Sequence, residues 1–512
     1  MILLLIHIVV LTHTGQIDAD SIIGSRFPSA GSSYVFAKET MGEEASVIAA
    51  ACLTLEYTGS ASAVARSWGD KVVTYIRSRH SDSILIPILD PGLGINPCAF
   101  VVSLGSILLL LKGVKESKAV TNFFSSLNVS LVFFMSAMSI FLAKKENLTP
   151  LIPPEFGASG ILRGATSSFF GYIGFDEICC VSGEAKEPSK NIPRAILLTL
   201  IIVTFLYISA SLGLVGMVPY KEISGTSGFP NGFRYAGYDL AAEITAVSHY
   251  LYFSFVLLFL IDWLTKSLFL QLGELTVLPV VVLVTIMAQP RLTYAMSVDG
   301  LLPPIFAEMD SSGNLNGGTR IAGTFMVMYV RGAQFNGATR VSSELTFMSV
   351  CFALRIATFV PFSYLDDLIS SGILLAFTIT DVSVILVRQT PETDSPFPIE
   401  KKIIAFNTLS FVTSLFLRNC SSNDTTARSI QILTIFSCAA TLFIGYQIQI
   451  HSDWSRNKLH SGVFLAPFMP ALPLTGCFVN LYLIAQLELS GLLAITGYIG
   501  VFLGLYVYKM YR

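Results

Sequence analysis

The feature that most constrains this chain is a series of apolar runs, each long enough to cross a lipid bilayer as a helix. A spanning helix needs roughly 20 mostly apolar residues, because the hydrocarbon core of a bilayer is about 30 Å thick. The backbone of each run must satisfy its own hydrogen bonds in that core, which favours helices. We expect spans at 43–64, 98–112, 119–143, 161–183, 193–218, 247–264, 270–290, 319–335, 345–360, 364–388, 402–418, 428–450, 462–487 and 490–510. The sequence therefore predicts an all-α polytopic membrane protein of about 12–14 spans.

Composition supports this class and argues against others. Charged residues make up 13% of the 512 residues, whereas a soluble protein has about a quarter. The net charge of -2 gives no indication of a nucleic-acid partner. The eight cysteines show no ligand-like spacing, so we expect buried thiols and no metal site. No hydrolase or metalloprotease motif is present, and we expect neither an enzyme nor a cofactor.

Three stretches fit the pattern of spans poorly. Ile2–Leu11 is apolar but too short to span, and no basic residue precedes it as in a signal peptide. We prefer to interpret it as the end of a helix that began further upstream, within a degenerate N-terminus at 1–22. The segments 247–270 and 319–355 add an extra apolar block and four arginines, which are costly at bilayer depth. We interpret both as insertions or rearranged sequence within a single domain, 1–512.

The charged connections predict which side each loop occupies. Lysine and arginine gather in alternate connections, which places those connections and the C-terminus in the cytoplasm. The intervening loops carry N-glycosylation patterns at Asn147, Asn419 and Asn423, consistent with an outward location. A further pattern at Asn128 lies inside a predicted span, where it could not be modified.

One predicted span, 161–183, carries helix-weakening residues beside a charge. Its central sequence is FFGYIGFDE, with Gly171 and Gly174 three residues apart and Asp176 close behind. Glu187-Pro188 then ends the helix, since proline disfavours helical structure before it. A broken turn of this kind releases backbone groups to a polar solute. Glycines in membrane helices also permit close helix packing, so composition alone leaves both interpretations open.

The run 169–195, FFGYIGFDEICCVSGEAKEPSKNIPRA, resembles the sixth-helix signature of the cationic amino acid transporters, within the amino acid–polyamine–organocation superfamily. Glu187-Pro188 stands where that family has Asn-Pro. Segment 289–302, from Gln289-Pro290-Arg291 onward, resembles the loop after the family's eighth helix. Further stretches agree in the family's order: 25–34, 55–68, 113–117 and 467–487. Matches in a fixed order are more specific than any one of them.

The resemblance implies a five-plus-five inverted repeat, followed by extra C-terminal helices. Substrate would bind near the membrane midplane, between broken first and sixth helices. Gly171, Tyr172 and Ile173 would then offer backbone oxygens to the α-ammonium group beside the break at Gly174, with Phe170 and Tyr172 shielding the site. The neighbouring Asp176 would cap the restarted helix or contact the substrate, and capping is the simpler interpretation.

Two further polar residues are candidates. Asn128 occupies a mid-span position where some bacterial relatives carry a lysine that replaces a coupling cation. Asparagine there suggests uniport driven by membrane potential, although an interhelical hydrogen bond explains it equally well. Glu56 is an acid within or at the edge of a span, and such residues are functional candidates by default.

These features predict transport of amino acids, arginine, lysine or ornithine foremost, by alternating access. The alternative is a transport-incompetent member that serves as an interaction or sensing subunit, or a truncated product, because nothing before Ile23 resembles the family's first helix. The expected partners are an amino acid substrate and the lipid bilayer, and no cysteine marks a link to a partner subunit. We expect a plasma-membrane protein, with the lysosomal membrane as the alternative, and leave cationic against neutral substrate open.

Overall fold

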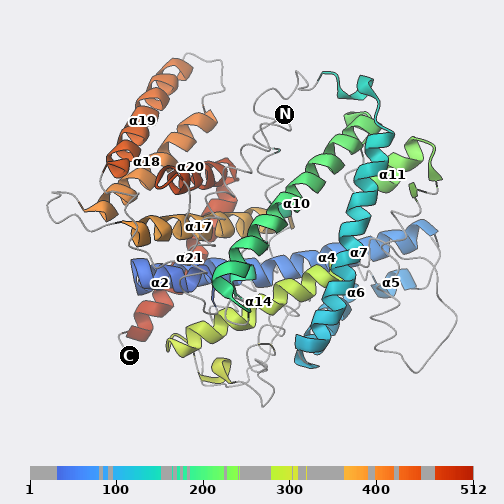
Figure 1. Cartoon of the computed structure of the whole chain (residues 1–512), viewed down its shortest axis with the longest axis horizontal. Coiled ribbons are helices and arrows are strands. Elements are labelled where there is room, and N and C mark those ends of the chain that lie inside the picture. Colours follow the sequence, from blue (N-terminus) through green and yellow to red (C-terminus); the bar gives the residue numbers. More distant parts are fainter. Residues whose placement is uncertain are drawn as a thin grey trace. The chain divides into compact units, whose positions relative to one another are not determined.

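The computed structural model describes only part of the chain, and every helix or turn discussed below lies in that part. The described residues are 31–79, 85–89, 96–112, 114–150, 164, 170–172, 174, 177–180, 185–223, 228–239, 241–242, 278–302, 304–308, 319, 362–389, 398–419, 426–450 and 468–510. Regular structure in these ranges is helical throughout (Figure 1). The chain forms two compact units, and each is built from separated stretches of sequence.

Six helices in the described residues are long and apolar enough to cross a membrane. They are Glu43–Asp70, Lys190–Met217, Val281–Val298, Leu368–Arg388, Ser429–Gln449 and Leu489–Met510. Large apolar side chains on several of them face outward, such as Phe205 at 64% exposed and Phe436 at 76% exposed. An outward apolar surface of this extent is unfavourable in water but natural against lipid tails. The prediction of an all-α polytopic membrane protein is confirmed.

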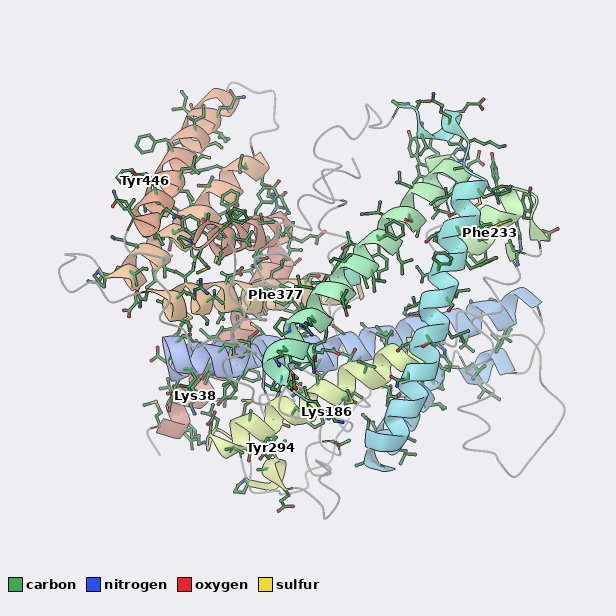
Figure 2. All side chains as sticks on the ribbon, viewed as in Figure 1. Lys38, Lys186, Phe233, Tyr294, Phe377 and Tyr446 are labelled. Carbon is green, nitrogen blue, oxygen red and sulfur yellow. The ribbon has the colours of Figure 1, made fainter. Side chains whose placement is uncertain are left out.

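One unit contains both the early and the late helices of the described chain. Its helices are α2 (Ser33–Met41), α3 (Glu43–Thr54), α17 (Phe362–Arg388), α18 (Ile399–Asn419), α19 (Thr426–Gln449), α20 (Ala471–Gln486) and α21 (Leu489–Met510). Helix α17 is the centre of this unit, because α2, α3, α20 and α21 all pack against it. Its span is 94% buried, and Figure 2 shows Phe377 on this helix. Tyr446, by contrast, projects outward from α19 (Figure 2).

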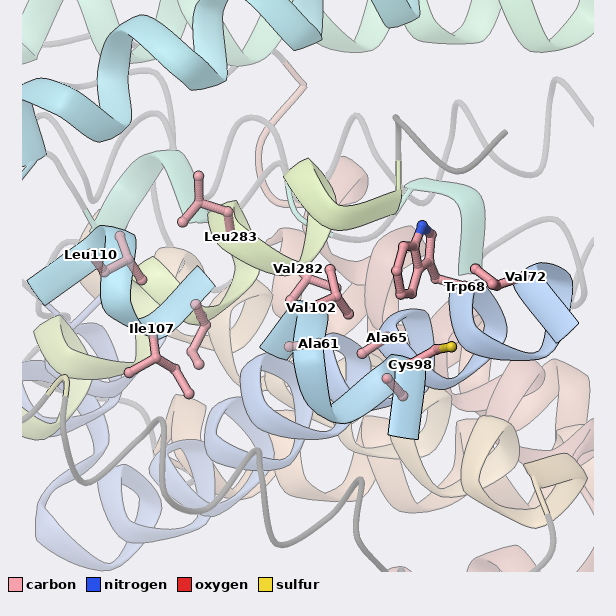
Figure 3. Close-up of a cluster of buried hydrophobic side chains, with 12 residues drawn as sticks. Ala61, Ala65, Trp68, Val72, Cys98, Val102, Ile107, Leu110, Val282 and Leu283 are labelled. Atoms are coloured by element: carbon pink, nitrogen blue, oxygen red, sulfur yellow. The ribbon is translucent and has the colours of Figure 1, made fainter. Parts of the chain in front are cut away.

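The other unit has its core between three helices. These are α4 (Ser60–Arg79), α6 (Pro97–Lys112) and α14 (Leu278–Val298). Figure 3 shows the cluster that they share, in which Trp68 and Ala65 of α4 pack near Val102 of α6 and Val282 of α14. Alanines along α4 let the helices approach closely, which is how membrane helices gain packing energy without a hydrophobic driving force.

Helix α6 begins where the sequence offers a strong N-terminal signal. The Asn96 side-chain oxygen accepts a hydrogen bond from the Ala99 backbone N–H at 3.0 Å, and Pro97 takes the first helical position. Both residues favour the start of a helix. The asparagine oxygen accepts from an N–H group that has no partner within the helix, and proline has no N–H group that needs one. The Asn96 amide also donates to Asp70 of α4 at 2.8 Å, which ties the two helices together.

A second cluster lies where α7 (Val114–Phe141), α10 (Pro188–Met217) and α11 (Gly228–Tyr235) meet. Phe233 of α11 is fully buried there and its ring centroid lies 6.5 Å from that of Phe134 (Figure 2). The Lys144 backbone N–H donates to the Gly216 carbonyl at 2.8 Å, which closes the connection after α7 onto the end of α10.

The predicted span boundaries agree with the structure for some described helices, such as α6, α17 and α21, and differ for others, most clearly near Pro290. We expected a span at 270–290 and a loop from Gln289 onward, but α14 runs from Leu278 through Pro290 to Val298. The expected loop is wrong: the backbone stays helical through Pro290, and side chains bond two carbonyls beside it. Arg291 Nη1 donates to the Met287 carbonyl at 2.6 Å, and Thr293 Oγ1 donates to that of Pro290 at 3.0 Å. Such bonds let membrane helices tolerate an internal proline.

Several predictions fall on residues outside the described ranges. They include the N-terminal segment 1–22, the block 247–270, all of 319–355 except Thr319, and Asn423. The interpretation of these segments, the total number of spans and the inverted repeat stay predictions.

Candidate functional site: a broken helix and three buried acids

The predicted span at 161–183 is interrupted in the structure. A single 3-10 turn, η3 (Phe170–Tyr172), comes before Gly174, and the short helix α9 (Glu177–Cys180) follows it. Gly174 has φ of 105°, a conformation that residues with a side chain rarely adopt. The backbone therefore leaves regular helix geometry at the second glycine of the FFGYIGFDE sequence.

The side chains around this break include a buried acid. Glu177 is 8% exposed, and a Cβ atom built on Gly174 would lie 3.8 Å from its carboxylate. Tyr172 is also buried at 8% exposed, whereas Gly171 is exposed. The turn thus places the exposed backbone of Gly171 next to the buried ring of Tyr172. A polar solute with an apolar part could bind to such an arrangement.

The structure places only some of the predicted site residues in this segment. Phe170 belongs to η3 by its backbone, and Gly171, Tyr172 and Gly174 are described as above. Ile173 and Asp176 lie outside the described residues. The roles of all six in binding substrate stay predictions. Glu177 was not singled out from sequence, although its place directly after the Gly-Phe-Asp sequence was a usable signal.

Glu56 lies in a second irregular stretch of helix. The π-helical turn η1 (Leu55–Gly59) joins α3 to α4, and the Glu56 side chain within it is fully buried. Single π-helical turns inside long helices occur frequently at functional sites, because they displace one residue from the regular register. Next to Glu56, Leu55 packs against Gly372 of α17, where an added Cβ would lie 3.3 Å from it.

Asp381 is a buried acid that the sequence analysis missed. It lies inside the α17 span and is fully buried, and Asn480 of α20 donates its amide hydrogen to Oδ2 at 3.3 Å. The usable signal was a lone aspartate within a span of mean hydropathy 1.9, since an acid in a membrane helix is a functional candidate.

Asn128 lies on α7 in the other unit and is half-buried. Directly after it, Val129 and Ser130 line a cavity of about 610 Å³ between α7 and α10, together with Phe133, Ile201, Ile202, Phe205 and Leu206. Apart from the Ser130 hydroxyl, this lining is apolar. A cavity without charged groups does not suit the ammonium and carboxylate of an amino acid, so it is not our candidate substrate site.

The predicted glycosylation sites are described in part. Asn147 lies in the turn η2 (Lys145–Leu148), and its side-chain amide donates to the Gly216 carbonyl at 2.9 Å. The nitrogen to which a glycan would attach is therefore already engaged within the fold. Asn419 ends α18, while Asn423 lies outside the described residues. Glycosylation at all three stays a prediction.

A comparison of the sequence with models of known protein families shows which family the chain belongs to. Residues 19–444, most of the chain, match the model described as "Amino acid permease". The chain belongs to the amino acid permease family. The match includes the broken segment around Gly174, Glu56, Asn128 and Asp381, so these residues lie within the part that the permease family shares.

Curated relatives agree with this assignment. The permease is 28% identical to the vacuolar cationic amino acid transporter 4 of Arabidopsis thaliana, over 91% of this chain and 78% of the relative. It is 29% identical to a methylthioribose transporter of Bacillus subtilis over 73% of this chain and 70% of the relative. It is 26% identical to the branched-chain amino acid permease BcaP of the same organism, over 71% and 69%. All three are transporters, which confirms the prediction that this chain is not an enzyme.

The family membership confirms that the function is transport of amino acids across a membrane, and it leaves the class of amino acid open. It confirms the resemblance stated from the sixth-helix sequence, because transporters named as cationic match over more than nine-tenths of the chain. The plant relatives are named as vacuolar or mitochondrial, so the expected plasma-membrane location stays a prediction. Residues before Gly31 lie outside the described part, and the expectation about the first helix stays a prediction as well.

Proposed function

We propose that this permease transports cationic amino acids, with arginine, lysine and ornithine as the preferred substrates. Support comes from the plant relatives named as cationic amino acid transporters, which match over 91–96% of this chain. The relatives named for branched-chain amino acids and methylthioribose match over 71–76% of it. The broader match therefore favours a cationic substrate over a neutral one.

The observation that carries the proposal is the helix break at Gly174. A break inside a spanning segment exposes carbonyl oxygens that are otherwise used within the helix. The carbonyls of Gly171, Tyr172 and Ile173 are proposed to bind the α-ammonium group of the substrate. The aromatic ring of Tyr172, with that of Phe170, would limit access of water, and a cation is well stabilised near such rings.

Glu56 and Asn128 are assigned secondary roles in the same proposal. Glu56 supplies a buried acidic group within the span Glu43–Asp70, and an acid at this depth is a candidate contact for a cationic side chain. Asn128 leaves the middle of α7 without a fixed positive charge, so the membrane potential alone would drive entry of a cation. That potential supplies about 2.3 kcal/mol per elementary charge per 100 mV.

The test is uptake of labelled arginine by cells or vesicles that contain the permease as written. Saturable uptake above the empty-vector level, inhibited by unlabelled lysine and not by leucine, is the expected result. Inhibition by leucine alone would assign a neutral substrate. Absence of uptake by protein that reaches the membrane would favour a non-transporting family member.

A variant links uptake to the broken segment. Gly171→Leu places a bulky side chain at the exposed position of η3 and should abolish uptake at an unchanged membrane level. Gly504→Leu on α21 is the matched control, because nothing lies within 4 Å of a Cβ built there. Normal uptake by the Gly171 variant would exclude this turn as the substrate site.

A further inference from the structure

The cavity between α7 and α10 has no role in the proposed transport, and its position follows from where these two helices touch. Near their C-terminal ends they are in close contact, because a Cβ built on Gly213 of α10 would lie 2.8 Å from the Cβ of Ser139 on α7. Closer to the cavity, the Ser136 hydroxyl donates to the Leu206 carbonyl at 3.4 Å. On the N-terminal side of these contacts the helices separate, and a cavity of about 610 Å³ opens between them.

The lining of this cavity suits an apolar occupant. Phe133 of α7 and Ile201 and Phe205 of α10 line it and are exposed. The Ser130 hydroxyl already donates to the Ser126 carbonyl at 2.8 Å, so it has no proton left to donate to a polar ligand. The volume lies in the range of about 300–1,000 Å³ that is typical of small-molecule sites. At bilayer depth, an open apolar cavity of this kind suits a lipid acyl chain and not water.

Both helices carry a basic residue on the N-terminal side of the cavity. Helix α10 is uninterrupted from Arg194 to the cavity, and Arg194 is exposed, seven residues before Ile201 and eleven before Phe205. These spacings put the three residues on one face of the helix, about 10 and 16 Å apart along its axis. Lys118 stands on α7 eleven residues before Val129, which also lines the cavity. One leaflet of bilayer hydrocarbon is about 15 Å thick, so a lipid headgroup at the level of Arg194 places its acyl chain in the cavity.

The charges also indicate the kind of headgroup. The contacts between α7 and α10 follow the same order along both helices, so the helices run in the same direction and their basic ends lie on the same side of the bilayer. The charge pattern of the connections predicts that this side is cytoplasmic, and anionic phospholipids are enriched in that leaflet. One turn before Arg194, Lys190 pairs with Glu187 at 3.0 Å, whereas the Arg194 side chain is exposed. An exposed guanidinium favours a phosphate, which it can bind through two parallel hydrogen bonds.

We propose that the cavity between α7 and α10 binds one acyl chain of an anionic phospholipid, whose phosphate lies beside Arg194. The apolar lining holds the chain, and the arginine selects the charge of the headgroup. A second copy of this chain suits the face less well, because a symmetric contact would bring the same cation of each copy together. The proposal does not depend on which solute the permease carries.

Photo-crosslinking in vesicles tests the proposal without a transport assay. The purified permease is reconstituted in phosphatidylcholine that contains phosphatidylserine with a diazirine in one acyl chain. After illumination, adducts located by mass spectrometry should be more frequent at 129–133 and 201–206 than at Ile432 and Phe436, which are exposed apolar residues of α19. Equal labelling of α19 would overturn the site.

Competition tests the headgroup. Excess unlabelled phosphatidylserine should suppress the cavity adducts, and the same excess of phosphatidylcholine should suppress them much less. Equal suppression by the two lipids would overturn the preference for an anionic headgroup. Suppression by a sterol but not by phosphatidylserine would also overturn the proposal, because the cavity would then belong to another ligand.

Arg194→Gln tests the contact with the phosphate. The amount of phosphatidylserine needed for half-suppression should rise about fivefold, which corresponds to the contribution of about 1 kcal/mol from one basic residue near an anionic membrane surface. Lys401→Gln is the matched control, because it removes an exposed cation from the first turn of α18, a helix that does not line the cavity. Unchanged competition in the Arg194 variant would exclude this contact.

A second variant tests the cavity itself and decides the matter if the Arg194 variant does not fold. Ile202→Trp places a larger side chain in the lining and should remove the adducts at 129–133. Ile432→Trp adds the same bulk to an exposed position of α19 and should leave those adducts unchanged. Full labelling of 129–133 in the Ile202 variant would overturn the proposal.

Discussion

Gly476→Ala is the substitution whose effect follows most directly from the structure. The three atoms nearest to the added Cβ, at 2.5, 3.1 and 3.3 Å, all belong to the Asp381 side chain. This side chain is short, buried and bonded to Asn480, so it cannot turn away at low cost. The new methyl group must displace the carboxyl group or separate α20 from α17.

The expected cost combines three effects. Overpacking a well-packed core costs typically about 1–3 kcal/mol. Loss of the hydrogen bond to Asn480 adds about 1 kcal/mol. Replacing glycine by alanine within a helix returns about 1 kcal/mol. The net destabilisation is therefore about 1–3 kcal/mol.

The control is Gly497→Ala on α21, where nothing lies within 4 Å of the added Cβ. This substitution should be neutral or stabilising, so the two alanine variants should differ by about 2–4 kcal/mol. The assay is thermal unfolding of each purified variant in the same detergent, followed by loss of the monodisperse peak in size-exclusion chromatography. The Gly476 variant should be lost at a clearly lower temperature than the wild type.

A double-mutant cycle identifies the cause. In an Asp381→Ala background the colliding atoms are absent, so Gly476→Ala should no longer destabilise the protein. If Gly476→Ala were tolerated as well as Gly497→Ala, or if its cost persisted without the aspartate, the packing argument would be refuted.

Three further predictions follow from other parts of the fold. Gly174→Ala should abolish uptake at normal membrane levels, because alanine is strained at φ of 105°. The control is Gly300→Ala, which is also strained, at φ of 76° with open space around it, but should still transport. Equal uptake by the two variants would show that the break at Gly174 is not needed for transport. The Glu222 carboxylate raises the pKa of the Tyr235 hydroxyl, so Glu222→Gln should move one tyrosine ionisation to lower pH in an ultraviolet titration; an unchanged titration curve would contradict this contact. Glycosidase treatment should increase the gel mobility of the wild type, and the shift should be smaller for an Asn147→Gln variant; no change in the wild type would count against outward loops at Asn147, Asn419 and Asn423.

Much of the fold was determined locally and could be predicted from sequence. The apolar runs predicted α6, α7, α10, α17, α18, α19 and α21 to within a few residues at most ends, because the length and hydropathy of a spanning helix are properties of one continuous segment. The glycines at 171 and 174 left a broken helix and close helix packing both open, and only the family resemblance favoured the break. The family resemblance also rested on short sequences in a fixed order.

Only the tertiary structure decided how those segments meet. The helix continues through Pro290, where the family resemblance predicted a loop. Asp381 and Asn480 are each ordinary polar residues in apolar runs until α17 and α20 pack at Gly476. Hydropathy shows that an acid enters the membrane, but it cannot show which residue from a distant helix will meet it. That partner is set by the packing of the two helices.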